Sequence, residues 1–235
     1  MLLTRAVWRV TTVRKWFKLG LGLLLLPTCL AATQALVEVI RGSGRADRFW
    51  FATLAGAGCW LSILWLLPRP MRIYVFGHEL THALWTWLLW GKVTRFKVAS
   101  RGGSVVTNRP NFLVTLAPYF FPLYAVGVVV GFAIGNSIWG WEDFSAAFCL
   151  LLGAAYAFHV TLNCEVLRTR QTDITSQGYL FSAAIIWLGN VFVLLLGIPL
   201  LTMQTKVSAG FIRSWELTLG LWASIAKLSW LRGST

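Results

Sequence analysis

The chain has 235 residues, of which 57% are hydrophobic and only 12% are charged, and its formal net charge is +13. Soluble globular domains carry about 25% charged residues, so this composition excludes an ordinary soluble domain. The Lys and Arg residues lie mostly between long apolar runs, which is typical of the loops of a membrane protein and argues against nucleic-acid binding. We therefore predict an integral membrane protein with the lipid bilayer as its partner.

The N-terminal part of the chain contains a basic segment followed by an apolar one. Residues 1–18 combine five basic residues with Leu, Val, Trp and Phe and predict a basic amphipathic surface helix. Residues 19–40 are the first apolar run long enough to cross a bilayer as a helix. A signal peptide with the core "LGLGLLLL" and the cleavage-like "ATQA" is the alternative. The length of the basic part favours a retained segment.

A second span, residues 49–67, ends at the break "PRPMR" over 68–72, because proline disfavours helix at the residue before it. Residues 71–91 predict a third span. In residues 92–109 apolar and polar residues then alternate around "RGGS", a pattern that predicts a β-hairpin over 93–107. The alternative is an ordinary basic loop.

Three further apolar runs predict the remaining spans, over residues 111–135, 144–164 and 179–202. In the first of these, Gly127, Gly131 and Gly135 recur at four-residue spacing, which predicts a small-residue face for close helix packing.

The C-terminal segment, residues 208–231, predicts an amphipathic helix, because its polar residues recur every three or four positions. These residues are Arg213, Glu216, Gly220, Ser224 and Lys227. The whole prediction is an all-α polytopic membrane protein with about six transmembrane helices, one short β-hairpin insertion and a C-terminal amphipathic helix. We expect one membrane domain over 1–235, with accessory segments 1–67 and a core 71–202.

The stretch "YVFGHELTHALWTW", residues 74–87, places His78, Glu79 and His82 inside an apolar run. Ionisable residues within membrane segments are costly and usually functional. Positions i and i+4 share one helix face, so His78 and His82 can direct two imidazoles at one metal. This is the HExxH arrangement, which predicts zinc as the metal and Glu79 as the general base. The alternative is a polar patch that serves helix association.

A hydrolytic zinc site needs a third protein ligand. We predict Asp173, which stands in the polar stretch "RQTDITSQG" just before a span, although Asp is also a common helix N-cap. His159 and Glu165 are alternative ligands. His159 and Asn163 lie one turn apart on one face and are candidates for contacting a substrate carbonyl or oxyanion.

These motifs resemble those of the site-2 protease family, the intramembrane zinc metalloproteases. The matching residues are "GHELTHALWTWLLWGKV" at 77–93, followed by the predicted hairpin and by "LAPYFFP" at 116–122. The resemblance covers roughly residues 71–200 and implies that Asp173 occupies the order of the family's third ligand. Asp173 stands in "QTDIT" rather than in the family's Leu-Asp-Gly motif, so the chain resembles a divergent minimal member without a PDZ domain.

The resemblance implies a zinc-dependent endopeptidase that hydrolyses peptide bonds in or near the transmembrane segments of membrane-protein substrates. The hairpin would hold the unwound substrate by strand addition. We expect a multi-pass protein of the cytoplasmic (inner) membrane. The alternative function is a non-catalytic scaffold or transporter-like bundle that retains a polar or metal cluster.

Overall fold

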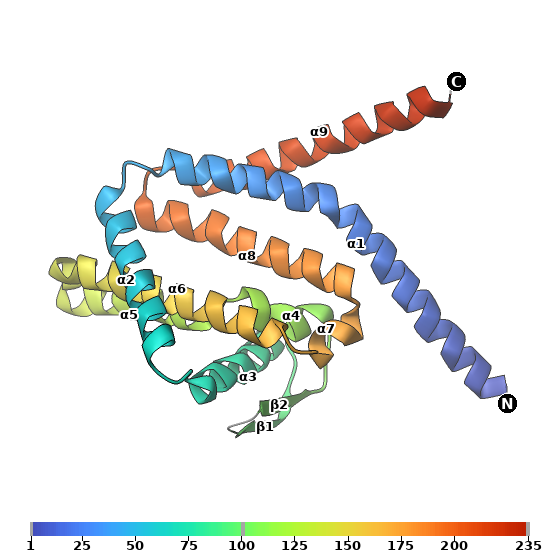
Figure 1. The fold of residues 1–235 in the computed structure, drawn as a ribbon, viewed down its shortest axis with the longest axis horizontal. Coiled ribbons are helices and arrows are strands. Elements are labelled where there is room, and N and C mark those ends of the chain that lie inside the picture. The colour runs from blue at the N-terminus through green and yellow to red at the C-terminus, as the bar shows by residue number, and fades with distance from the viewer. Residues whose placement is uncertain (1, 100–101, 234–235) are drawn as a thin grey trace. The chain divides into compact units, whose positions relative to one another are not determined.

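The computed structural model describes residues 2–99 and 102–233. Within these residues the chain forms nine α-helices, one short 3-10 helix and one antiparallel pair of strands (Figure 1). An all-α fold with a single β-hairpin is thus confirmed. The contacts divide the chain into two compact units, one made of Met1–Arg45 with Thr172–Thr235 and the other of Ala46–Gln171.

The first unit contains four helices, α1 (Leu2–Gly42), α7 (Thr172–Gln177), α8 (Tyr179–Thr202) and α9 (Val207–Gly233). Helix α1 packs along both α8 and α9 (Figure 1). The surface helix predicted over residues 1–18 is wrong as a separate element, because one continuous helix runs through it into the apolar segment. No proline or polar loop interrupts the chain at that junction, so the helix continues.

Polar side chains join α1 to its two neighbours. The indole nitrogen of Trp187 in α8 donates to the hydroxyl of Thr33 in α1, at 2.9 Å. Arg213 in α9 pairs with Glu38 in α1, with 2.9 Å between Nε and Oε2. Part of the polar stripe predicted for the C-terminal helix therefore contacts another helix of the same unit.

The second unit contains the remaining elements. They are α2 (Asp47–Leu66), α3 (Met71–Leu88), β1 (Val93–Ala99), β2 (Gly102–Thr107), α4 (Phe112–Phe120), α5 (Leu123–Trp139), the 3-10 helix η1 (Trp141–Phe144) and α6 (Ser145–Leu167).

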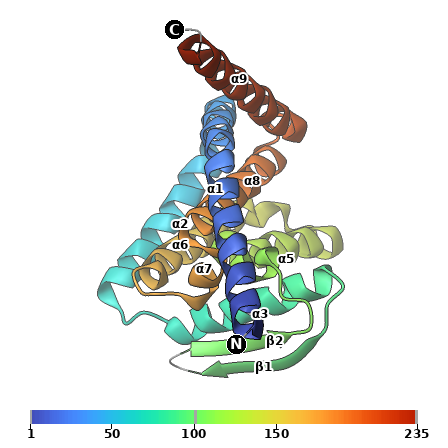
Figure 2. The same ribbon diagram turned by 90° about the vertical axis from the view of Figure 1, so that its right-hand side faces the viewer.

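The predicted hairpin is confirmed. Strands β1 and β2 pair antiparallel, with Phe96 opposite Val105 and an irregularity between Val93 and Arg95. The predicted turn "RGGS" begins at Arg101, which lies outside the described residues, and its last three residues belong to β2. The hairpin lies along α3 (Figure 2), where the rings of Phe76 and Phe96 meet edge to face, 6.3 Å between centroids.

Among the described residues, four helices are long and apolar enough to cross a membrane, or five if the bent pair of α4 and α5 counts as one span. The four are Lys15–Gly42, Asp47–Leu66, Trp141–Leu167 and Tyr179–Thr202. By length and composition the chain is a helical membrane protein. Six spans are not confirmed, because α3, which carries the histidines, is not among these helices.

The span predicted over residues 111–135 is not one straight helix, because α4 and α5 meet at an angle of 74°. The break falls at Phe121, whose backbone is extended at φ −95° and ψ 107°. Pro122 follows Phe121, and the residue before a proline is driven out of the helical region. The bend turns α4 toward α3.

Glycines make the tightest helix crossing of the second unit. A Cβ atom added at Gly56 in α2 would overlap the carbonyl group of Leu150 in α6, and one added at Gly153 would overlap the carbonyl of Thr53. The two helices therefore approach until their backbones touch, as small residues allow within membranes. The predicted face behaves differently: the ring of Trp141 in η1 packs directly on Gly135, whereas no described atom outside their own helix lies within 4 Å of a Cβ built at Gly127 or Gly131.

Gly56→Ala is expected to destabilise the second unit by about 1–3 kcal/mol, because the added methyl group forces the α2 and α6 backbones apart. Thermal unfolding of the full chain in detergent measures the change. Gly58→Ala is the matched control in the same helix, because no described atom lies within 4 Å of its added Cβ. Equal unfolding temperatures for the two variants would contradict the close crossing.

Candidate metal centre

His78 and His82 lie on one face of α3, as their spacing predicts. Their ring centroids are 4.9 Å apart and their ring planes are nearly perpendicular. Both side chains are half-buried, and Glu79 beside them is only 7% exposed. The helix alone thus brings two imidazoles and one carboxylate together, because one turn separates the two histidines.

The His82 ring is held by a backbone carbonyl of α4. Its Nδ1 lies 2.8 Å from the carbonyl oxygen of Val114, and a carbonyl only accepts, so Nδ1 carries the proton. Pro118 stands four residues after Val114 and has no N–H to donate to that carbonyl within the helix. The His82 imidazole takes the place of the missing donor, which turns its Nε2 away from Val114.

The His78 ring contacts a tyrosine one turn earlier in α3. The hydroxyl of Tyr74 donates to Oδ1 of Asn163 at 2.7 Å, and it lies 3.5 Å from Nδ1 of His78. Since the single phenolic proton is used toward Asn163, the hydroxyl can only accept from His78. A proton on Nδ1 of His78 matches this contact, and this tautomer leaves the ligating lone pair on Nε2.

Asn163 in α6 bridges the bend between α4 and α5. Its amide nitrogen donates to the carbonyls of Pro118 and Tyr119, each at 3.3 Å. Both carbonyls lack their helical donor: Pro122 has no N–H, and the N–H of Leu123 bonds to Phe121 instead. Asn163 thus satisfies backbone groups that the bend exposes, and its predicted contact with a substrate stays a prediction.

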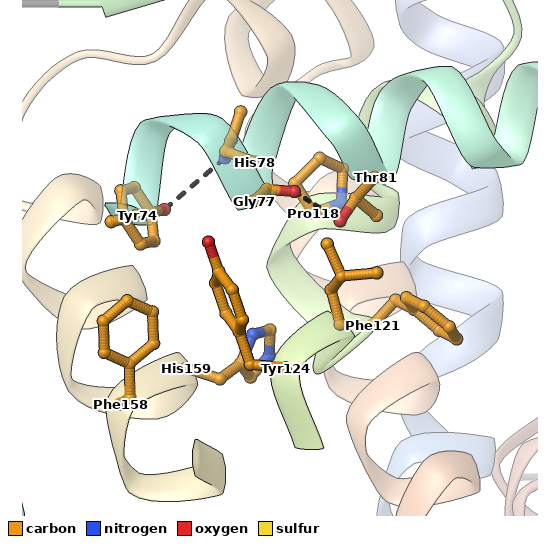
Figure 3. A pocket seen from close by; sticks show the side chains of 10 residues that line it. Tyr74, Gly77, His78, Thr81, Pro118, Phe121, Tyr124, Phe158 and His159 are labelled. Atoms are coloured by element: carbon orange, nitrogen blue, oxygen red, sulfur yellow. Dashed lines mark hydrogen bonds between the residues drawn. The ribbon is translucent and has the colours of Figure 1, made fainter. Parts of the chain in front are cut away.

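A small cavity lies between α3 and the segment around the bend (Figure 3). Its volume is about 20 Å³, which is room for one ordered water molecule. His78 lines it on one side, and Tyr124 and His159 line it on the other. His159 is 7% exposed, with Nε2 3.2 Å from the Asn163 amide nitrogen. Of the two predicted substrate-contacting residues, His159 is the one that lines this cavity.

The hairpin passes directly over Glu79. A Cβ atom built at Gly103 in β2 would collide with the Glu79 side chain, with Oε1 only 2.7 Å away. Only a glycine allows the strand backbone to approach the carboxylate this closely. The predicted hairpin and the predicted general base, which the sequence suggests separately, are therefore in contact.

The two candidate carboxylate ligands have different surroundings. Glu165, at the end of α6, pairs with Arg69 at 2.6 Å and with Arg168 at 3.3 Å, so it belongs to an ion-pair cluster. Asp173 is half-buried in the first turn of α7, which belongs to the first compact unit, whereas the histidines belong to the second. Its role as third ligand stays a prediction.

The structure adds residues that the sequence analysis missed. Tyr74 and the carbonyl of Val114 contact the two histidines, and Pro118 frees that carbonyl. Two signals were present in the sequence: Tyr74 stands four residues before His78, and Pro118 and Pro122 are four residues apart in "LAPYFFP". The spacing of the prolines indicates carbonyls without helical donors, but not the side chains that contact them.

Comparisons with known proteins found no relative for this fold and site. No family model matches the chain, and neither a curated protein nor a solved structure matches it. The function is therefore argued from the geometry of the site.

Pro118→Ala is expected to lower the affinity of the full chain for Zn²⁺ by roughly tenfold, the low end of the range for losing an outer hydrogen bond to a ligand. The new N–H competes with His82 for the carbonyl of Val114 and so loosens the ring. Competition with a chelator measures the affinity. Pro199→Ala, which also removes a proline from inside a helix, is the control. Unchanged affinity in a folded Pro118→Ala variant would contradict the assignment.

Proposed function

We propose that the chain is an intramembrane zinc-dependent endopeptidase that hydrolyses peptide bonds in or near the transmembrane segments of membrane proteins. One observation carries the proposal: both histidines of the motif direct Nδ1 to protein groups, His82 toward Val114 and His78 toward Tyr74. Metal-ligating histidines commonly hold their second nitrogen in this way, which fixes the ring and leaves Nε2 for the ion.

The donor set of the chain fits zinc. The proposed ligands are His78 and His82 of α3 and Asp173 of α7, and each offers one ligand atom to a metal ion. Two neutral imidazoles and one carboxylate are a common zinc-binding combination, which keeps a fourth position for water or substrate. Asp173 completes the set in this proposal because it occupies the order of the third ligand in the family that the motif resembles.

In this proposal Glu79 is the general base. When bound, the zinc ion would act as a Lewis acid toward the scissile carbonyl and lower the pKa of a water ligand. Glu79 would accept the proton from the attacking water and pass it to the leaving amine. Its burial beneath the Gly103 backbone keeps the carboxylate near the histidines. His159 would donate to the substrate oxyanion from the wall of the cavity.

The hairpin gives the site a way to accept a peptide. A substrate helix must unwind before cleavage, because its carbonyls are already hydrogen-bonded. The extended stretch could pair with the hairpin by strand addition, and main-chain hydrogen bonds would then hold it in place. Since β2 crosses Glu79, a peptide aligned with the hairpin would run close to the general base.

Glu79→Gln is expected to keep bound zinc and to lower the cleavage rate by about 10²- to 10⁴-fold, the usual contribution of a general base. The full chain is reconstituted in liposomes with a library of labelled transmembrane peptides, and mass spectrometry identifies the fragments. Elemental analysis gives zinc per chain. Wild-type protein purified without zinc, or a Glu79→Gln variant that cleaves at the wild-type rate, would refute the proposal.

Asp173→Asn is expected to weaken zinc binding by more than the roughly 10- to 100-fold that the loss of an outer hydrogen bond costs, because it removes a ligand. Asp143→Asn, in the 3-10 helix η1, makes the same chemical change as a control and should leave zinc affinity unchanged. The readout is again chelator competition on the full chain. Equal zinc affinity in the two variants would show that another residue is the third ligand.

A further inference from the structure

A second cavity lies within the first compact unit, between residues 15–19 of α1 and residues 175–181, where α7 joins α8. Its volume is about 510 Å³, within the size range of pockets that hold a small ligand. Residues of all three helices line it, including Lys15, Lys18, Thr175, Ser176, Tyr179 and Phe181.

The polar part of this cavity suits an anion. Lys15 and Lys18 line it, and none of the described lining residues is acidic. Nζ of Lys18 donates to Oε1 of Gln177 at 2.6 Å, which fixes the ammonium group at the cavity wall. The hydroxyl groups of Thr175 and Ser176 donate within α7, to the carbonyls of Thr172 and Asp173, so the lysines supply the donors for an anion. The N-terminus of α8 opens at the same cavity without a side-chain cap, and the N-terminus of so long a helix favours negative charge.

The apolar part of the cavity suits a lipid rather than a free ion. Leu19, Leu180 and Phe181 complete the wall next to the lysines. The candidate membrane span of α8 begins at Tyr179, which lines the cavity, so the cavity lies at the boundary of that span. Trp16 and Tyr179 are 67% and 66% exposed at this level. Exposed aromatic residues of this kind are typical of the membrane interface, where lipid headgroups lie.

We infer that this cavity binds the phosphate-bearing headgroup of an anionic phospholipid. The two lysines contact the phosphate group, the N-terminus of α8 favours its negative charge, and the leucine and phenylalanine side chains contact the first part of the acyl chains. This inference does not depend on the proposed protease activity, because none of its lining residues belongs to the candidate metal centre.

The test titrates phosphatidylglycerol in mixed micelles against the full chain in a neutral detergent, while native mass spectrometry counts the bound lipids. The expected result is one saturable site. Lys15→Ala with Lys18→Ala should lower the affinity about 30-fold, and Lys15→Ala alone about fivefold, because each lysine near a lipid phosphate contributes equally. The single variant keeps the bond between Lys18 and Gln177, so it tests the site if the double variant fails to fold.

The matched control is Arg41→Ala with Lys206→Ala, which removes one positive charge at the other end of α1 and one in the loop that follows α8. It should change the affinity for phosphatidylglycerol by less than about twofold. An equal loss of affinity in the two double variants would overturn the inference, because it would indicate attraction by overall charge. Two other outcomes would also overturn it: phosphatidylcholine binding as tightly as phosphatidylglycerol, or inorganic phosphate binding as tightly as the lipid.

Discussion

The hydrogen bond from Nδ1 of His82 to the carbonyl of Val114, at 2.8 Å, is the interaction on which the candidate metal centre depends. It joins α3 to α4 and fixes the tautomer of one histidine. It exists because Pro118 cannot donate to that carbonyl, which would otherwise be used inside α4. A buried carbonyl without a donor is costly, so satisfying it also stabilises the contact between the two helices.

The same principle acts a second time at the bend. Pro122 leaves the carbonyl of Pro118 without its helical donor, and the amide of Asn163 takes its place. Asn163 in turn accepts from Tyr74, which contacts His78. The bend and the histidine pair are thus parts of one polar network within the second unit. Irregular backbone at membrane depth is tolerated where protein surrounds it, and here it supplies the acceptors that orient the site.

Local patterns predicted the elements well, and nonlocal contacts were harder to predict. Apolar runs located helices such as α8, and alternation located the hairpin, because each pattern follows from the geometry of one element. The regular spacing of Gly127, Gly131 and Gly135 predicts a packing face, but only Gly135 is closely packed, against Trp141. The close crossing instead uses Gly56 and Gly153, one from each helix. Spacing within one helix does not reveal which glycine meets a backbone in another.

The site shows the same division, and it also suggests why two partners of the histidines, the Val114 carbonyl and the Tyr74 hydroxyl, are neutral. The spacing of His78, Glu79 and His82 sets their shared face, whereas the carbonyl of Val114 and the phenol of Tyr74 become partners only through folding. In many metal sites a carboxylate holds the outer nitrogen of a histidine. Burying further charge in an apolar protein is expensive, and this chain has only eight acidic residues. A carbonyl freed by proline and a tyrosine hydroxyl orient the rings without adding charge, so the charge can be kept for Glu79 and for the ligand that completes the site.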